Sequence, residues 1–188
     1  MDAIAILKDD HQRVKALFDK FEATTDRAVK TRRKLVDDMI RELSVHAFIE
    51  EQVFYPAVRQ GVPSLNSDVL EAIEEHHVVK WLLSELDDLA PDAENFAPKV
   101  VVLTESVTHH VKEEEKDLFP AVRKSLSRAE LEALGEQLVK KKKVAPDKPH
   151  PRGPSQPPAF DAQEAVAKVA ERVSAAKDKL VDRIKAAN

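Results

Sequence analysis

The sequence predicts an all-α protein: an antiparallel, up-down-up-down four-helix bundle with an additional helix and a proline-rich C-terminal extension. Three observations support this fold class. Glycine occurs only 3 times in 188 residues and aromatic residues make up 5%, a composition that favours helices over sheets. Apolar residues recur at helical spacing in four consecutive segments. The breaks between these segments are short, so sequential helices should be antiparallel neighbours.

The four segments fill residues 1–125, which we expect to form the bundle. The first two apolar stripes run through Ile4, Leu7, Val14, Phe18 and Phe21, and then through Val36, Ile40, Leu43 and Phe54. The third and fourth run through Val69, Ala72, Val79, Leu83 and Leu86, and through Val100, Leu103, Val107, Val111 and Leu118. Polar, glycine or proline residues mark the breaks at 24–26, 61–64 and 91–98.

The chain beyond residue 125 contains three further parts. Residues 126–144 are predicted to form an accessory helix, because Ser127 and Glu130 match a capping box. The lysines at 140–143 are interpreted as cations that favour the end of that helix. Residues 145–160 form a proline-rich linker. Residues 161–188 have the narrow apolar stripe of an amphipathic helix, which either folds back on the bundle or binds a protein partner.

Composition excludes several classes of function. A formal charge of -4 argues against nucleic-acid binding, which needs a basic face. The absence of cysteine removes disulfides, iron–sulfur clusters and thiolate zinc sites. No run approaches the roughly 18 apolar residues of a membrane span, and the first residues lack the pattern of a secretory leader. We therefore expect a cytoplasmic protein that does not associate with membranes.

A repeat relates the two halves of the bundle. His11 and His76 lie 65 residues apart in similar surroundings, and His46 and His110 lie 64 apart. The repeated ionisable residues are His11, His46 and Glu50 in the first half and His76, His110 and Glu114 in the second. Two hairpins of one design should face each other, so that these side chains converge near the axis of the bundle.

The helical phase places these six residues on the apolar stripes. His46 lies about 40° from Glu50 on one helix face, for example, because the two are four residues apart. Buried ionisable groups need partners, and a hydrogen-bond network without metal would carry a large desolvation cost. Metal ligation explains the pattern better. Imidazole and carboxylate ligands suit Fe, Mn or Zn, and two shared glutamates suggest two metal ions.

Four segments carry a resemblance to the hemerythrin-like (HHE cation-binding) family: DHQRVKALF, HAFIEEQVFYP, EEHHVVKWLLSEL and HVKEEEKDLFP. The resemblance implies a non-haem centre of two iron ions with an oxo or hydroxo bridge, Mn or Zn being less expected. It also implies terminal ligands at His11, His46, His76 and His110, with Glu50 and Glu114 bridging.

The sequence departs from the classical oxygen carriers of that family in two places. The carriers have a fifth histidine four residues after the position of His76, where this chain has Lys80. They also have an aspartate where Glu115 stands. A missing ligand leaves an exchangeable position, which favours binding or consuming O2, hydrogen peroxide or nitric oxide in stress defence or sensing. Catalase-like peroxide consumption is one such activity, and a metal-dependent regulatory or iron-donating module without turnover is the alternative.

Three further residues are candidates for lesser roles near the centre. His77 and Glu115 are second-tier metal ligands, and His77 is expected at the edge of the core. Tyr55 has phenylalanine at the equivalent position of the second half, Phe119. A buried phenol there could donate a hydrogen bond at the metal centre, so Tyr55 is a candidate catalytic residue. His109, flanked by Glu105 and Glu113, is interpreted as part of a solvated ion-pair face.

Overall fold

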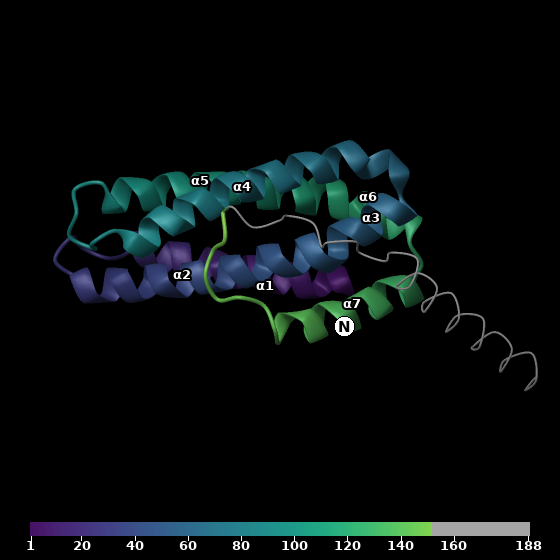
Figure 1. The fold of residues 1–188 in the computed structure, drawn as a ribbon, viewed down its shortest axis with the longest axis horizontal. Coiled ribbons are helices and arrows are strands. Elements are labelled where there is room, and N and C mark those ends of the chain that lie inside the picture. The colour runs from purple at the N-terminus through teal and green to yellow at the C-terminus, as the bar shows by residue number, and fades with distance from the viewer. Residues whose placement is uncertain (152–188) are drawn as a thin grey trace, which may run out of the picture.

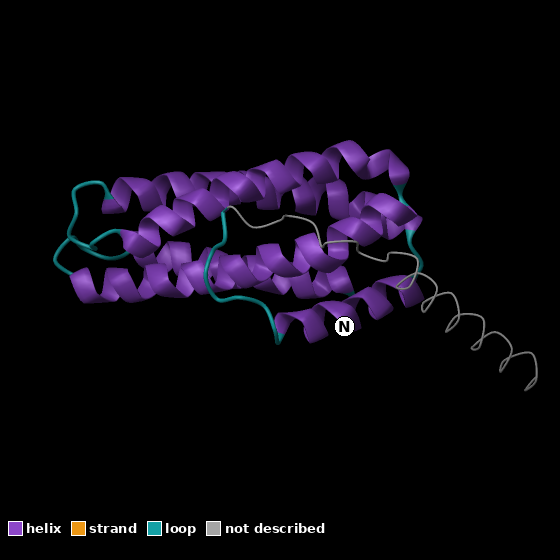
Figure 2. Ribbon diagram, viewed as in Figure 1, coloured by secondary structure: helices purple, strands orange, loops and turns teal. Residues whose placement is uncertain are grey.

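The structure, a computed structural model, describes residues 1–151, and every regular element in that range is a helix (Figure 2). The elements are α1 (Ala3–Glu22), α2 (Val29–Ile49), the π-helix η1 (Glu50–Phe54), α3 (Tyr55–Gly61), the 3-10 helix η2 (Pro63–Leu65), α4 (Asn66–Asp88), α5 (Phe96–Glu113), the π-helix η3 (Glu114–Leu118), α6 (Phe119–Ser125) and α7 (Arg128–Lys142). The predicted all-α class is confirmed.

Four long rods make up the bundle (Figure 1). The first is α1, the second continues from α2 through η1 into α3, the third is α4, and the fourth continues from α5 through η3 into α6. The connections between α1 and α2 and between α4 and α5 lie at one end, and α3 and α6 lie at the other (Figure 1). Each rod is therefore antiparallel to the next, as the short connections require.

The additional helix α7 lies along the first hairpin, in contact with α1, α2 and η1 (Figure 1). The predicted capping box is present: Ser127 Oγ accepts from the Glu130 amide, and the Glu130 carboxylate accepts from the Ser127 amide. Gly135 allows the close approach of the chain's first residues, because a Cβ there would lie 2.4 Å from the carbonyl oxygen of Met1. The predicted helix over 161–188, and most of the predicted linker over 145–160, lie outside the described residues.

One break is shorter than predicted. Residues 91–98 were expected to be irregular, but α5 begins at Phe96, so that Pro98 lies in its first turn. Proline is tolerated there because the first amides of a helix have no intrahelical acceptor to lose. No helix among the described residues is both long and apolar enough to cross a membrane.

The apolar core is divided into two clusters along the bundle. One cluster, near the α1–α2 and α4–α5 connections, includes Val14, Phe18, Met39, Leu83 and Leu103. The other, near α3, α6 and α7, includes Leu7, Ile49, Phe54, Val69 and Leu138. Between the two clusters each of the four rods contributes buried polar side chains, among them His11, His46, His76 and His110, and this buried polar layer is where the candidate site lies.

Candidate metal centre

Six ionisable side chains form the middle of the polar layer, and each is at most 5% exposed. They are His11 on α1, His46 at the end of α2, Glu50 at the start of η1, His76 on α4, His110 on α5 and Glu114 at the start of η3. These are the six residues predicted as metal ligands, and the structure brings all of them together.

The six side chains fall into two groups able to hold a metal ion. One group contains His11, His46, Glu50 and Glu114, and the other contains Glu50, His76 and His110. Within each group, the ligand atoms lie within 4.8 Å of one another. The Nε2 atoms of His11 and His46 are 3.2 Å apart, and those of His76 and His110 are also 3.2 Å apart.

Glu50 and Glu114 connect the two groups. Glu50 Oε2 lies 3.1 Å from Nε2 of His46 on its own rod and 3.4 Å from Nε2 of His76 on the opposite hairpin. Glu114 Oε2 lies 3.3 Å from Nε2 of His11 and 3.5 Å from Nε2 of His110. Each carboxylate thus approaches one histidine of each hairpin, which is the placement that a bridging ligand between two metal ions requires.

An outer set of carboxylates fixes the histidine rings. The Nδ1 atoms of three histidines lie within hydrogen-bond distance of a glutamate: His11 with Glu115 (2.9 Å), His76 with Glu51 (3.0 Å) and His110 with Glu75 (2.7 Å). The fourth pair is looser, with 3.7 Å between His46 Nδ1 and Asp10 Oδ2. A carboxylate acceptor places the proton on Nδ1, so the Nε2 atoms of His11, His76 and His110 each present a lone pair to the centre.

The centre therefore contains more hydrogen-bond acceptor atoms than donor groups. At His76 and His110, whose Nδ1 atoms face carboxylates, two Nε2 lone pairs face each other at 3.2 Å, close to carboxylate oxygens. Both oxygens of Glu50 and Oε2 of Glu114 are buried without a hydrogen-bond partner. Unpaired buried acceptors are costly, and a cation would satisfy all of them at once. The donor set of nitrogen and carboxylate oxygen fits Fe, Mn or Zn.

Burial favours the neutral, metal-binding form of two of the four histidines. Burial lowers the pKa of His46 to about 4, although Asp10 opposes this shift, and burial also lowers the pKa of His76. Burial disfavours the charged form of His110 too, but the carboxylates of Glu114 and Glu75 outweigh it and raise that pKa. The pKa of Glu50 is raised well above its usual range by burial and by the adjacent Glu114 carboxylate. Two bare carboxylates side by side are unfavourable, and metal ions would neutralise both.

Two π-helical turns position Glu50 and Glu114, and the helical periodicity of the sequence did not predict these turns. The amide of Tyr55 donates to the carbonyl of Glu50, five residues earlier, and that of Phe119 donates likewise to Glu114. Pro56 and Pro120 follow directly, and a proline ring clashes with the carbonyl four residues before it in a regular α-helix. The repeated proline six residues after each glutamate was the available signal.

Tyr55 is completely buried beside the centre. Its hydroxyl donates to Glu114 Oε1 at 2.9 Å and lies 3.4 Å from His76 Nε2. Burial, together with the Glu114 and Glu50 carboxylates, raises the pKa of the phenol well above its usual range, so it keeps its proton. Phe119 takes the equivalent place in the second half, and its ring stacks on that of His11. The two halves thus differ in one hydrogen-bond donor.

The remaining sequence candidates lie outside the two groups. Glu115 accepts from His11 Nδ1 and pairs with Lys8 at 3.3 Å, so it orients the His11 ring. His77 lies at the edge of the core, 3.1 Å from Glu74. Lys80 is buried, and its ammonium donates to both oxygens of Glu51 at 2.9 and 3.1 Å. The residue in place of a fifth histidine therefore supports the carboxylate that orients His76.

A small cavity adjoins the centre on the side of the first core cluster. Its volume is about 20 Å³. All four histidines of the centre border it, and the apolar side chains of Val14, Leu43, Ala47, Val79, Val107 and Val111 complete its wall. A space of this size holds a water-sized or diatomic molecule and excludes organic substrates.

Comparison with known proteins supports this description of the fold. Residues 2–122 match the model of the hemerythrin HHE cation-binding domain. An uncharacterized hemerythrin-like protein of Schizosaccharomyces pombe is 29% identical over 155 residues, which cover 82% of this chain and 75% of that protein. A DNA nickase of Nostoc is 31% identical over 68% of this chain, but the match covers only 35% of the nickase. The crystal structure of a hemerythrin HHE cation-binding domain-containing protein from Mycobacterium kansasii is similar with a TM-score of 0.64 and 27% identity, covering 77% of this chain and 86% of that one.

Proposed function

The chain belongs to the hemerythrin HHE cation-binding domain family, and we propose that it is a non-haem di-iron protein that binds or consumes O2, hydrogen peroxide or nitric oxide. The proposed ligands are the six residues of the polar layer. His11 and His46 would hold one ion and His76 and His110 the other, with Glu50 and Glu114 shared between them. The observation that supports two ions is that each glutamate approaches a histidine of both groups.

The cavity beside the histidines supports a small ligand. At about 20 Å³ it admits a diatomic molecule or peroxide, and its valine and leucine side chains offer that molecule no competing hydrogen bond. Two ferrous ions, when bound, supply the two electrons that reduction of O2 or peroxide requires. This single feature carries the functional proposal, since a purely structural metal site would need no such space.

The chain's own side chains would prepare the centre for this chemistry. The outer carboxylates hold the imidazole rings and keep their protons away from the metal-facing nitrogens. Tyr55 holds Glu114 by donating to Oε1, which leaves Oε2 directed at the histidines. Tyr55 is not among the residues that line the small cavity. Its proposed role is therefore to position a bridging carboxylate.

Metal analysis tests the first part of the proposal. Protein isolated without added metal should contain two iron ions per chain, and His46→Ala or Glu114→Ala should lose most of them. His150→Ala should retain full loading, because that residue lies in the C-terminal extension. Full iron content in both ligand variants would refute the assignment.

Small-ligand binding tests the second part. Val107→Leu should reduce the cavity and slow the binding of nitric oxide to the reduced protein, while Leu43→Ala should enlarge it and speed binding, with iron content unchanged in both. Val102→Leu, at an exposed position on the same helix, is the matched control. Equal rates in all three variants would mean that ligands do not use the cavity. Turnover of peroxide per iron would then separate an enzyme from the alternative of a regulatory or iron-donating module.

A further inference from the structure

A second, more exposed group of potential ligands lies on the surface next to the centre. His109 Nε2 is 3.3 Å from Oε1 of Glu113 and 3.6 Å from Oε1 of Glu75. These three residues can together hold a metal ion. The other oxygen of Glu75, Oε2, lies 2.7 Å from Nδ1 of His110, one of the proposed inner ligands. The outer group and the inner centre thus share a carboxylate.

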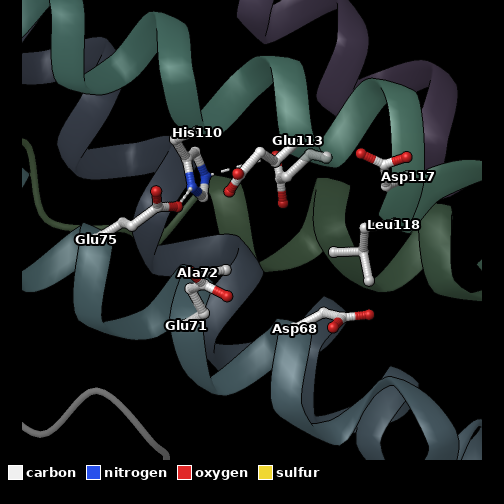
Figure 3. A pocket seen from close by; sticks show the side chains of 9 residues that line it. Asp68, Glu71, Ala72, Glu75, His110, Glu113, Asp117 and Leu118 are labelled. Carbon is white, nitrogen blue, oxygen red and sulfur yellow. Dashed lines mark hydrogen bonds and ion pairs between the residues drawn. The ribbon is translucent and has the colours of Figure 1, made fainter.

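An acidic pocket of about 200 Å³ begins at this group and lies between α4 and the rod formed by α5 and η3 (Figure 3). Its lining carboxylates are Asp68, Glu71 and Glu75 on α4, Glu113 on α5, and Glu114 and Asp117 on η3. Asp68, Glu71 and Glu75 follow one another at intervals of three and four residues, and Asp117 lies four residues after Glu113, so that two acidic stripes face each other across the pocket. Among the described residues that line it, none is lysine or arginine.

The pocket reaches the inner centre at Glu114. That side chain is 2% exposed, and its Oε2 atom has no hydrogen-bond partner. Because Glu114 also lines the pocket, a buried carboxylate with an unsatisfied oxygen lies at its inner end. A cation in the pocket would have acidic side chains along the whole distance from the exposed His109 to this proposed bridging ligand.

The internal repeat shows that packing does not require these acids. In the first half, the positions equivalent to Asp68, Glu71, Glu113 and Asp117 are Ala3, Ile6, Ile49 and Val53. These four apolar residues are all buried, and α7 packs on the elements that carry them. The equivalent of His109 is Val45. The surface between α1 and the α2–η1 rod is thus apolar and covered by α7. The equivalent surface between α4 and the α5–η3 rod is acidic and contains the pocket.

We infer that the acidic pocket is an entry route for ferrous ions, with an outer cation site at Glu75, His109 and Glu113. This inference rests on the proposed function, since the route leads to the proposed iron centre. The outer site would hold a divalent cation weakly, because two of its three side chains are substantially exposed, His109 at 62% and Glu113 at 46%. The acidic stripes would then raise the local cation concentration and direct the ion towards Glu114.

The rate of iron uptake tests the route. Apo protein is mixed with ferrous ion under anaerobic conditions, and uptake is followed by competition with a chromophoric chelator. The double variants His109→Ala/Glu113→Gln and Asp68→Asn/Asp117→Asn should fill on the order of three- to tenfold more slowly, with a weaker dependence on salt. Their final iron content should equal that of wild type. Glu105→Gln removes an exposed carboxylate from α5 outside the pocket and should fill at the wild-type rate.

Manganese binding tests the outer site separately. Protein whose inner centre has been filled with zinc should bind one further, weakly held Mn²⁺ per chain by electron paramagnetic resonance. The His109→Ala/Glu113→Gln variant should lose this ion, and Glu105→Gln should keep it. Uptake rates equal to wild type in both double variants, at full loading, would overturn the inference alone. A wild-type protein that takes up no iron would overturn the proposed function and this inference with it.

Discussion

Lys142, near the end of α7, donates a hydrogen bond to Oδ1 of Asp10 on α1, and Asp10 is the carboxylate that faces Nδ1 of His46. Asp10 is 2% exposed and also accepts from Arg13. Burial raises its pKa, but the neighbouring His46 imidazole and the Lys142 ammonium outweigh burial, so the pKa is lowered. The additional helix thus reaches the candidate metal centre through one ammonium group, in addition to covering the core.

We expect Lys142→Met to weaken iron binding. Without the ammonium, Asp10 loses a hydrogen bond that fixes its position, and it orients His46 less well. Loss of a group that orients a metal ligand typically costs about 10- to 100-fold in metal affinity. The measurement is iron affinity by chelator competition. Lys141→Met, at the exposed neighbour, should behave as wild type. An unchanged iron affinity in Lys142→Met would show that the Lys142–Asp10 contact only stabilises the packing of α7 on α1.

Tyr55→Phe should retain iron but alter the centre. Its hydroxyl is the donor to Glu114 Oε1, so the variant leaves a buried carboxylate oxygen unsatisfied, at a cost of about 1–3 kcal/mol in the apo protein. The iron absorption spectrum should shift because a proposed bridging ligand loses its hydrogen bond. Phe119 occupies the equivalent position in the second half. Adding Phe119→Tyr to Tyr55→Phe should therefore not restore the wild-type spectrum. Identical spectra for wild type and Tyr55→Phe would contradict a positioning role.

The fold and the convergence of the six side chains could be predicted because both depend on periodicity. Helical spacing fixes which face each residue occupies, and the internal repeat relates the two hairpins, so that His11 and His76 had to point inward together. The ligand roles themselves stay predictions that metal analysis must test.

The outer layer could not be predicted in the same way. Glu51 reaches Lys80 and His76 only because the π-helical turn changes the helical phase after Glu50. The contact of Lys142 with Asp10 joins residues 132 positions apart, and no spacing rule relates them. The lysines at 140–143 were interpreted through the helix dipole alone, which misses the position of α7 against α1.

The pH dependence of the apo protein should report the histidines. The fold lowers the pKa of His46 from 6.5 to about 4, so the unfolded chain takes up a proton at a higher pH than the folded chain does. The contribution of His46 to the free energy of unfolding is therefore present above pH 6.5. It is lost as the pH falls towards 4, and the loss is at most about 3 kcal/mol. His46→Gln should flatten urea-unfolding stability over this range. Equally steep profiles for the two apo proteins would rule out the buried, neutral His46.

Glu50→Gln should stabilise the apo protein and weaken metal binding. The fold raises the pKa of Glu50, because burial and the neighbouring Glu114 disfavour its charged form. A raised pKa gives a contribution to the free energy of unfolding that is complete when the pH is below 4.5, the pKa in the unfolded chain. This contribution is lost as the pH rises through the pKa of the folded protein. At pH 8 the apo protein therefore carries this cost, and a neutral amide removes it, for a gain on the order of 1–3 kcal/mol. At pH 4 the variant should gain little.

The same substitution removes a proposed bridging oxygen, so iron content should fall while the apo melting temperature at pH 8 rises. A fall in iron content together with a rise in apo melting temperature indicates a carboxylate that binds metal. Substitution of a carboxylate that only packs would lower the stability of both the apo and the iron-loaded protein. Glu105→Gln, at an exposed position, should change neither quantity. The measurements are calorimetric melting of the apo protein at pH 4 and pH 8, and iron content after anaerobic loading. A lower apo melting temperature at pH 8 would mean that Glu50 holds the polar layer together without metal, and it would remove the electrostatic argument for cations at this site.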